Sequence, residues 1–156
     1  MNMDVPEQFH FVSRRMVEFA DTDLAGIMHF ANFLRFAESA EHAYFRSLGH
    51  TVHGSTPGQH HGWPRIEVSC KYHRPARFEQ TLATCLRIEE IRSSSLRYGF
   101  WTFLADDPAR PLLAHGSCAI IHVTLDPAGG AMHKTPVPPA LRHLLERAPD
   151  VLLSKP

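Results

Sequence analysis

The chain has 156 residues, of which 44% are hydrophobic and 21% are charged, so its length suits one hydrophobic core and predicts a single domain over residues 1–156. The 16 basic and 16 acidic side chains cancel, which argues against nucleic acid or an anionic membrane as a partner. No apolar run reaches the roughly 18 residues of a membrane span, and the N-terminal residues lack the basic and apolar regions of a signal peptide. These features predict a soluble cytoplasmic protein.

The first half of the chain predicts a strand followed by one long helix. Residues 9–19 alternate loosely between apolar and polar side chains, which indicates a strand that ends at a turn around Asp21. From Phe30 to Leu48 the apolar residues recur every three or four positions, as in an amphipathic helix, and Gly49 suits the position after the C-cap. About 19 residues at this rise give a rod of roughly 28 Å, which needs a sheet to cover it.

The second half predicts a meander of four strands over residues 66–72, 82–91, 95–104 and 113–123. A turn over residues 126–130 closes the last strand, and Pro138-Pro139 opens a short amphipathic helix. The order of these elements indicates an α+β fold with one antiparallel sheet and its helices on one face. Such a curved sheet leaves edge strands, which a dimer would protect.

The cysteines and histidines predict neither a disulfide framework nor a metal site. The cysteines are odd in number and far apart, and each lies in a predicted strand, so we expect small core residues: Cys70, Cys85 and Cys118. Twelve histidines are many for this length, and four of them lie in a Gly/Pro-rich segment over residues 50–61. Their spacing fits no familiar metal site, which favours a solvated loop over a divalent metal site.

The segment from Asp21 to Asn32 is where we expect chemistry. A strand ends at two aspartates, the chain passes Gly26, and a helix begins. A carboxylate in this position lies beside unpaired backbone N–H groups and the positive end of a helix dipole, so one loop could supply both a base and an oxyanion site. We expect Asp21 to hold the turn by accepting backbone N–H bonds. For Asp23, capping the loop is the alternative to catalysis.

Through this segment and a second motif, the chain resembles the 4-hydroxybenzoyl-CoA thioesterase family of the hot-dog fold. The resemblance covers nearly the whole chain and implies a curved antiparallel sheet of five or six strands wrapped around one long central helix. Two motifs carry it: Asp21-Thr22-Asp23-Leu24-Ala25-Gly26-Ile27 with Asn32-Phe33, similar to the family's D-x-D-x-x-G-[IV] pattern, and Ser94-Ser95-Leu96, similar to the serine pair that begins its central strand.

The resemblance implies that Asp23 is the catalytic carboxylate and that backbone N–H groups near His29 and Phe30 polarise the thioester carbonyl. Many relatives carry Tyr-His where this chain has His29-Phe30. The His29 side chain could donate to the acyl group, or it could be a satisfied histidine at an interface. The resemblance also implies a homodimer or homotetramer in which a neighbouring subunit completes each site.

Five further residues are candidates for substrate binding. Gly26 could allow a positive φ or a close approach of substrate. Asn32 could orient substrate or water, or make only a local hydrogen bond. Arg92, Ser94 and Ser95 carry guanidinium and hydroxyl donors that suit the phosphates of coenzyme A, although arginines are also common on surfaces.

These residues predict an acyl-CoA thioesterase that releases free acid and CoA and needs no metal or redox cofactor. A thioester carbonyl is electrophilic and its thiolate leaves readily, so one carboxylate and an oxyanion site can suffice. Asp23 could attack directly or deprotonate water, and aromatic, medium-chain and short-chain acyl groups all stay open. The alternatives are a thioesterase for acyl carrier protein and a non-catalytic module that binds acyl-CoA.

Overall fold

The computed structural model describes residues 5–56, 59–126, 130–147 and 153–154. Its helices are α1 (Phe30–Ser47) and α2 (Pro139–Arg147), with a 3-10 turn at Phe19–Asp21. Its longer strands are β2 (Phe11–Met16), β5 (Arg65–Tyr72), β6 (Thr81–Ile91), β7 (Ser95–Leu104) and β8 (Leu112–Ile121). Its shorter strands are β1 (Gln8–Phe9), β3 (Gly54–Thr56), β4 (Gln59–Gly62), β9 (Val123–Leu125), β10 (Met132–Lys134) and β11 (Leu153–Ser154).

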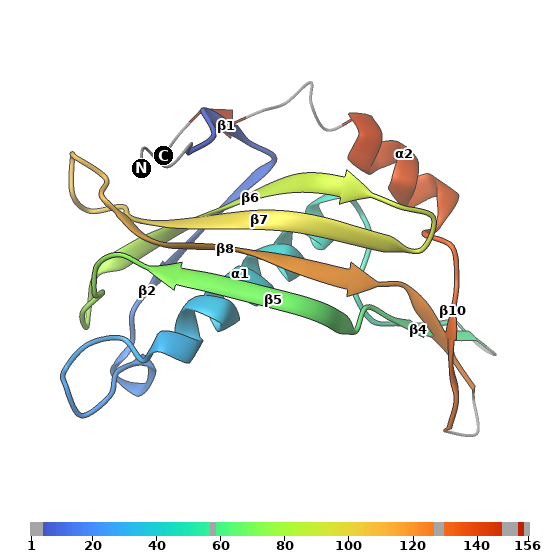
Figure 1. Cartoon of the computed structure of the whole chain (residues 1–156), viewed down its shortest axis with the longest axis horizontal. Coiled ribbons are helices and arrows are strands. Elements are labelled where there is room, and N and C mark those ends of the chain that lie inside the picture. The colour runs from blue at the N-terminus through green and yellow to red at the C-terminus, as the bar shows by residue number, and fades with distance from the viewer. Residues whose placement is uncertain (1–4, 57–58, 127–129, 148–152, 155–156) are drawn as a thin grey trace.

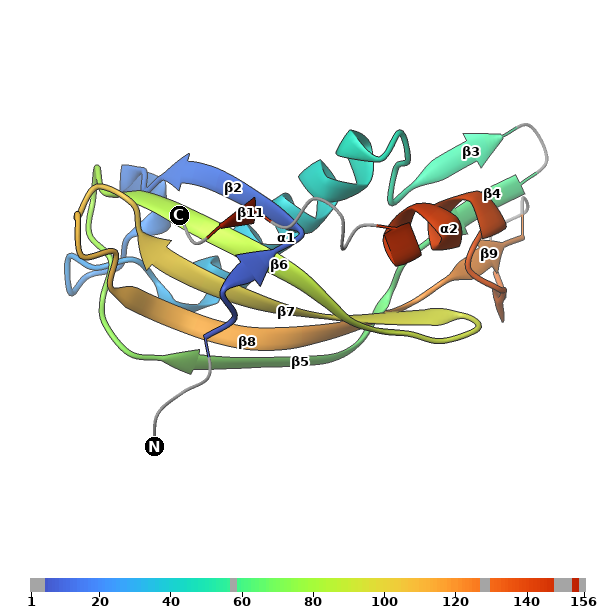
Figure 2. The same cartoon turned by 90° about the horizontal axis from the view of Figure 1, so that it is seen from above.

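The five longer strands form one antiparallel sheet in the order β2-β6-β7-β8-β5. Helix α1 runs along one face of this sheet, and the sheet curves toward it (Figures 1 and 2). The predicted α+β architecture, with a curved antiparallel sheet against one long helix, is confirmed. Among the described strands, β5 pairs only with β8 and therefore forms an open edge of this sheet.

Helix α1 begins and ends where its sequence predicts. It starts at Phe30 and ends at Ser47, with Leu48 as the C-cap and Gly49 at φ +76°, a backbone angle that glycine adopts without strain. One stripe of the helix is buried against the inner face of the sheet, where it meets Leu86, Leu96, Phe100 and Ile120. In the described ranges, neither helix combines the length with the apolar character that a membrane crossing requires.

The prediction of a solvated loop over residues 50–61 is wrong for part of that segment. Strands β3 and β4 lie there and join β9 and β10 in a second antiparallel sheet. Strands this short show no periodicity, and β4 is held by pairing with β9, for example His61 opposite Thr124, far along the chain. Among the described residues, no three His, Cys, Asp or Glu side chains are grouped so that they could hold a metal ion.

The three cysteines lie in strands, as predicted. Cys85 in β6 and Cys118 in β8 are buried, and Cys70 in β5 is half-buried. Burial raises the pKa of the Cys85 thiol to about 12, so this thiol stays protonated at neutral pH. These side chains therefore act as small core residues.

A buried carboxylate ties the middle of α1 to the sheet. Glu41 is 1% exposed, and its Oε2 accepts a hydrogen bond from Arg65 Nη2 at 2.9 Å and another from the Tyr98 hydroxyl. Its Oε1 is buried without a partner among the described residues. Burial raises the pKa of Glu41, although Arg65 and Tyr98 oppose the shift.

The substitution Glu41→Gln should flatten the pH dependence of stability. Because the folded pKa is raised, the folded state holds a proton on Glu41 that the unfolded state has already lost. The Glu41 contribution to the free energy of unfolding is therefore most favourable below the unfolded pKa and is lost as pH rises through the folded pKa. Urea denaturation from about pH 4 to pH 7 should show wild type losing stability relative to Glu41→Gln as pH rises.

The matched control is Glu38→Gln, because Glu38 also faces Arg65, at 3.4 Å, but its side chain is 46% exposed. This variant should change the wild-type slope only slightly, because the charge of Glu38 is the smallest of the causes that shift the pKa of Glu41. Identical slopes for wild type and Glu41→Gln would contradict the raised pKa.

Candidate functional site

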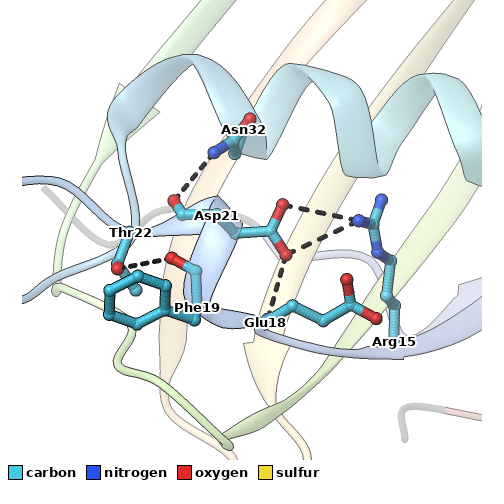
Figure 3. A network of polar contacts seen from close by, with 6 residues as sticks. All are labelled: Arg15, Glu18, Phe19, Asp21, Thr22 and Asn32. Carbon is cyan, nitrogen blue, oxygen red and sulfur yellow. Dashed lines mark hydrogen bonds and ion pairs between the residues drawn. The ribbon is translucent and has the colours of Figure 1, made fainter.

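The turn between β2 and α1 is held together by Asp21 (Figure 3). Its carboxylate is largely buried and accepts hydrogen bonds from the Glu18 amide at 3.0 Å and from Arg15 Nη2 at 3.4 Å. Its carbonyl oxygen accepts two more, from the His29 amide at 2.9 Å and from Asn32 Nδ2 at 2.7 Å. Asp21 thus holds the turn by accepting backbone N–H bonds, as its sequence position predicts, and it fixes the turn to the start of α1.

Asp23 lies on the loop that this turn positions. Its Oδ1 accepts a hydrogen bond from the Ala25 amide at 2.8 Å, and its amide donates to the Ile27 carbonyl at 2.9 Å. Gly26 closes the loop at φ +71°, which agrees with the predicted positive φ. No described residue donates to the other carboxylate oxygen. One oxygen therefore caps the loop while the second is available for chemistry, so the two interpretations of Asp23 are compatible.

Asp23 forms part of the wall of a pocket of about 470 Å³ at the start of α1. The pocket is lined by Asp23, Ile27, Met28, Phe30, Phe33, Tyr72, His73, Arg74 and Pro75. The Tyr72 ring lies edge-on to Phe30 and Phe33, with ring centroids 6.3 Å and 5.6 Å apart. Most of the wall is aromatic or aliphatic, which suits an apolar group of a ligand.

Four of the lining residues come from the end of β5 and the segment after it, and sequence reasoning assigned none of them to the pocket of their own chain. The alternation along this strand predicts a polar face with His73, either solvated or lining a groove of the opposite subunit, and it gives Tyr72 no role in a site. Two hydrogen bonds bring this segment against the loop, from the Met28 amide to the Ala76 carbonyl at 2.8 Å and from the Tyr72 hydroxyl to the Phe30 carbonyl at 3.2 Å. Both contacts join segments distant in the sequence, so no local pattern could have indicated them.

At the start of α1, one backbone N–H group has no acceptor among the described residues. The His29 amide already donates to Asp21, and the Ala31 amide donates to Nδ1 of the His29 ring at 3.2 Å. The Asn32 amide donates to the His29 carbonyl at 2.9 Å. Within the described residues the Phe30 amide has no acceptor. Of the two amides predicted to polarise a carbonyl, Phe30 is therefore the one that can still donate.

Asn32 is 8% exposed, and its side-chain amide is committed to the Asp21 carbonyl. This contact favours the local hydrogen bond over the role in binding substrate. The His29 ring lies against the Phe30 ring, tilted by 31° with centroids 4.4 Å apart, while its Nδ1 accepts the Ala31 amide and caps the helix. Phe30 therefore lines the pocket, while His29 caps the start of the helix beside it.

The predicted phosphate-binding residues lie at the other end of the sheet. Arg92, Ser94 and Ser95 form the turn between β6 and β7, which Figure 1 shows beside α2 and away from the start of α1. Arg92 Nε is paired with Glu90 Oε1 at 2.8 Å, and Ser94 is buried. One chain therefore does not bring these residues to the Asp23 pocket.

Comparison with known proteins identifies the family. The sequence profile of the thioesterase superfamily matches residues 25–103, about half of the chain. The chain belongs to the thioesterase superfamily. This membership confirms the prediction of a hydrolytic enzyme of the thioesterase type.

Relatives of known structure share the fold of this superfamily member. A 1,4-dihydroxy-2-naphthoyl-CoA thioesterase from Synechocystis superimposes with a TM-score of 0.74 at 22% identity, over 88% of this chain and 96% of that one. A gentisyl-coenzyme A thioesterase superimposes with a TM-score of 0.68 at 20% identity, over 87% of this chain and 99% of that one. The predicted hot-dog fold is confirmed.

A sequence relative is a 1,4-dihydroxy-2-naphthoyl-CoA hydrolase of Prochlorococcus marinus, 31% identical over 94 residues, which cover 56% of this chain and 62% of the relative. Less than two thirds of that relative is therefore matched. These relatives carry several different names, so they support the superfamily rather than the 4-hydroxybenzoyl-CoA branch that the sequence resembles.

Asn32→Ala should destabilise the thioesterase turn. The substitution removes a buried hydrogen bond to the Asp21 carbonyl, and we expect the free energy of unfolding to fall by about 1–2 kcal/mol in chemical denaturation. Ser39→Ala is the control, because Ser39 is exposed on the same helix. A variant as stable as the control would show that this hydrogen bond does not hold the turn.

Proposed function

We propose that this protein is an acyl-CoA thioesterase in which Asp23 is the catalytic carboxylate and the Phe30 amide polarises the thioester carbonyl. The observation that carries the proposal is the position of Asp23, which lies on the wall of an apolar pocket with one carboxylate oxygen free. The Phe30 amide at the helix start belongs to the same pocket edge and has no acceptor among the described residues. A carbonyl placed between them would face an anionic oxygen and an N–H donor aligned with a helix dipole.

The overall reaction adds water across the C–S bond, so that the acyl carbon gains an oxygen and the sulfur leaves as the CoA thiol. Asp23 has two routes to this result. It can take a proton from water as the water attacks, or it can attack the carbonyl to form a mixed anhydride that water then hydrolyses. In both routes the Phe30 amide stabilises the negative charge that develops on the carbonyl oxygen.

Two kinds of support favour CoA thioesters. Relatives are named as CoA thioesterases with aromatic acyl groups, 1,4-dihydroxy-2-naphthoyl and gentisyl. The pocket walls offer Phe30, Phe33 and Tyr72 to an apolar acyl group. An acyl carrier protein substrate is the second candidate, because the same phosphopantetheine arm would reach the pocket.

The active form in this proposal is a homodimer or homotetramer with sites between subunits. Edge strand β5 exposes apolar side chains, with Ile66 at 60%, Val68 at 41% and Tyr72 at 45%. Exposed edges of this kind pair with other strands unless they are covered. Since Tyr72 also lines the Asp23 pocket, a second copy that pairs along β5 would wall the pocket on its open side.

Asp23→Asn should abolish turnover and leave the fold intact. The amide cannot act as base or nucleophile, so we expect kcat to fall by about 100-fold or more in a thiol-release assay over a panel of acyl-CoAs. Asp107→Asn is the matched control, because Asp107 Oδ1 accepts the Ala109 amide at 2.8 Å in a similar exposed turn. A variant that keeps more than about a tenth of the wild-type kcat would contradict an essential carboxylate.

Val68→Lys should disrupt the oligomer. A lysine on an edge strand opposes strand pairing between copies, so light scattering after size exclusion should report a monomer with low thioesterase activity. Met132→Lys places the same charge on an exposed position of β10 in the second sheet and should change neither property. An unchanged oligomer in Val68→Lys would place the interface elsewhere.

A further inference from the structure

Basic side chains gather at the Asp23 pocket and beside it, where β5 ends next to β8. His73 and Arg74 line the pocket and are exposed. Lys71 precedes them on β5, and His115 lies beside them on β8. In the ranges that the structure describes, neither Lys71 nor Arg74 takes part in an ion pair. We call these four residues the basic rim.

The basic rim is fixed to the acid loop and is not a set of loose surface side chains. The amides of His73 and Arg74 both donate to the Leu113 carbonyl, at 2.7 Å and 3.2 Å. Two residues further on, the Ala76 carbonyl accepts the Met28 amide at 2.8 Å. Backbone hydrogen bonds thus hold the rim on one side to β8 and on the other to the loop that carries Asp23.

The imidazole of His73 is also held in place. Its Nε2 lies 2.8 Å from Nδ1 of His115, and the two rings stack with centroids 5.0 Å apart at 10°. One nitrogen of this contact must carry a proton and the other must accept it. His73 is therefore oriented at the pocket edge by a partner on the neighbouring strand.

We propose that the basic rim, with Arg74 as its principal residue, binds a phosphate group on the carrier arm of the thioester substrate. This inference rests on the proposed function. The pocket wall is apolar apart from Asp23 and the rim, so it suits the acyl group, while the anionic part of the substrate must lie at the mouth. A free guanidinium offers a fork of N–H donors that matches phosphate oxygens.

The rim fits this role better than the turn that the sequence suggested. Arg92 lies at the far end of the sheet and is already paired with Glu90 at 2.8 Å. Arg74 lines the same pocket as Asp23, and no ion pair among the described residues includes it. Within one chain, a substrate bound at Asp23 therefore lies nearer to Arg74 than to Arg92.

The experiment compares one acyl group carried on coenzyme A with the same acyl group carried on pantetheine, which has no phosphate. For Arg74→Gln we expect KM for the CoA thioester to rise by about fivefold with little change in kcat, a typical effect of one lost charge-assisted contact at a surface. KM for the pantetheine thioester should stay at the wild-type value. Arg46→Gln is the matched control and should leave both values unchanged, because Arg46 is exposed on the last turn of α1, away from the pocket at its start. Arg92→Gln is assayed beside it as a test of the β6–β7 turn.

Each other outcome overturns the inference. An equal rise on both substrates would place Arg74 on the acyl or pantetheine part, as expected if the rim bound an acyl carboxylate instead. No rise, or a CoA-specific rise only in Arg92→Gln, would move the phosphate site away from the rim. If wild type hydrolyses neither ester, the proposed function fails, and calorimetry with free CoA still tests the rim, because Arg74→Gln must bind CoA more weakly than wild type.

Discussion

The geometry of the candidate site depends on a single carbonyl oxygen, that of Asp21. It accepts hydrogen bonds from the His29 amide and from the buried Asn32 side chain, and so it fastens the end of the β2 turn to the first turn of α1. A backbone carbonyl with two donors leaves the loop between them little freedom to move. The Asp23 loop is therefore held at both ends, with the helix start on one side and the turn on the other.

This constraint also decides which polar groups are left for a ligand. The carboxylate of Asp21 accepts hydrogen bonds from Arg15 and the Glu18 amide, and the His29 amide donates to the Asp21 carbonyl. These groups are therefore not available to a ligand. Among the described residues, the polar groups left on this loop and helix start are one oxygen of Asp23 and the Phe30 amide. The two aspartates of one motif thus have different roles because one is buried inside a hydrogen-bond network and the other is exposed on the loop which that network supports.

Sequence reasoning succeeded where the information is local. The bounds of α1, the positive φ of Gly26 and the strands β6 and β7 follow from periodicity and from glycine chemistry within a short window. It failed where structure depends on distant partners. The short strand β4 exists because it pairs with β9, and the β5 end reaches the pocket through the Met28 contact with Ala76. Neither contact leaves a pattern in the residues that make it.

Two arginines, one at each end of β5, also differ in whether a hydrogen-bond network holds them. Strand β5 spans eight residues and separates Arg65, which is drawn inward by Glu41, from Arg74, which is left at the pocket mouth without an ion-pair partner among the described residues. A buried carboxylate holds its arginine strongly, because leaving either charge alone in a low-dielectric interior is costly. Beyond the other end of the strand, no described ion pair includes the guanidinium of Arg74. Arg65 therefore stabilises the fold, whereas Arg74 is exposed to solvent at the pocket. Of these two, only Arg74 can bind an anionic ligand without breaking an ion pair that stabilises the protein.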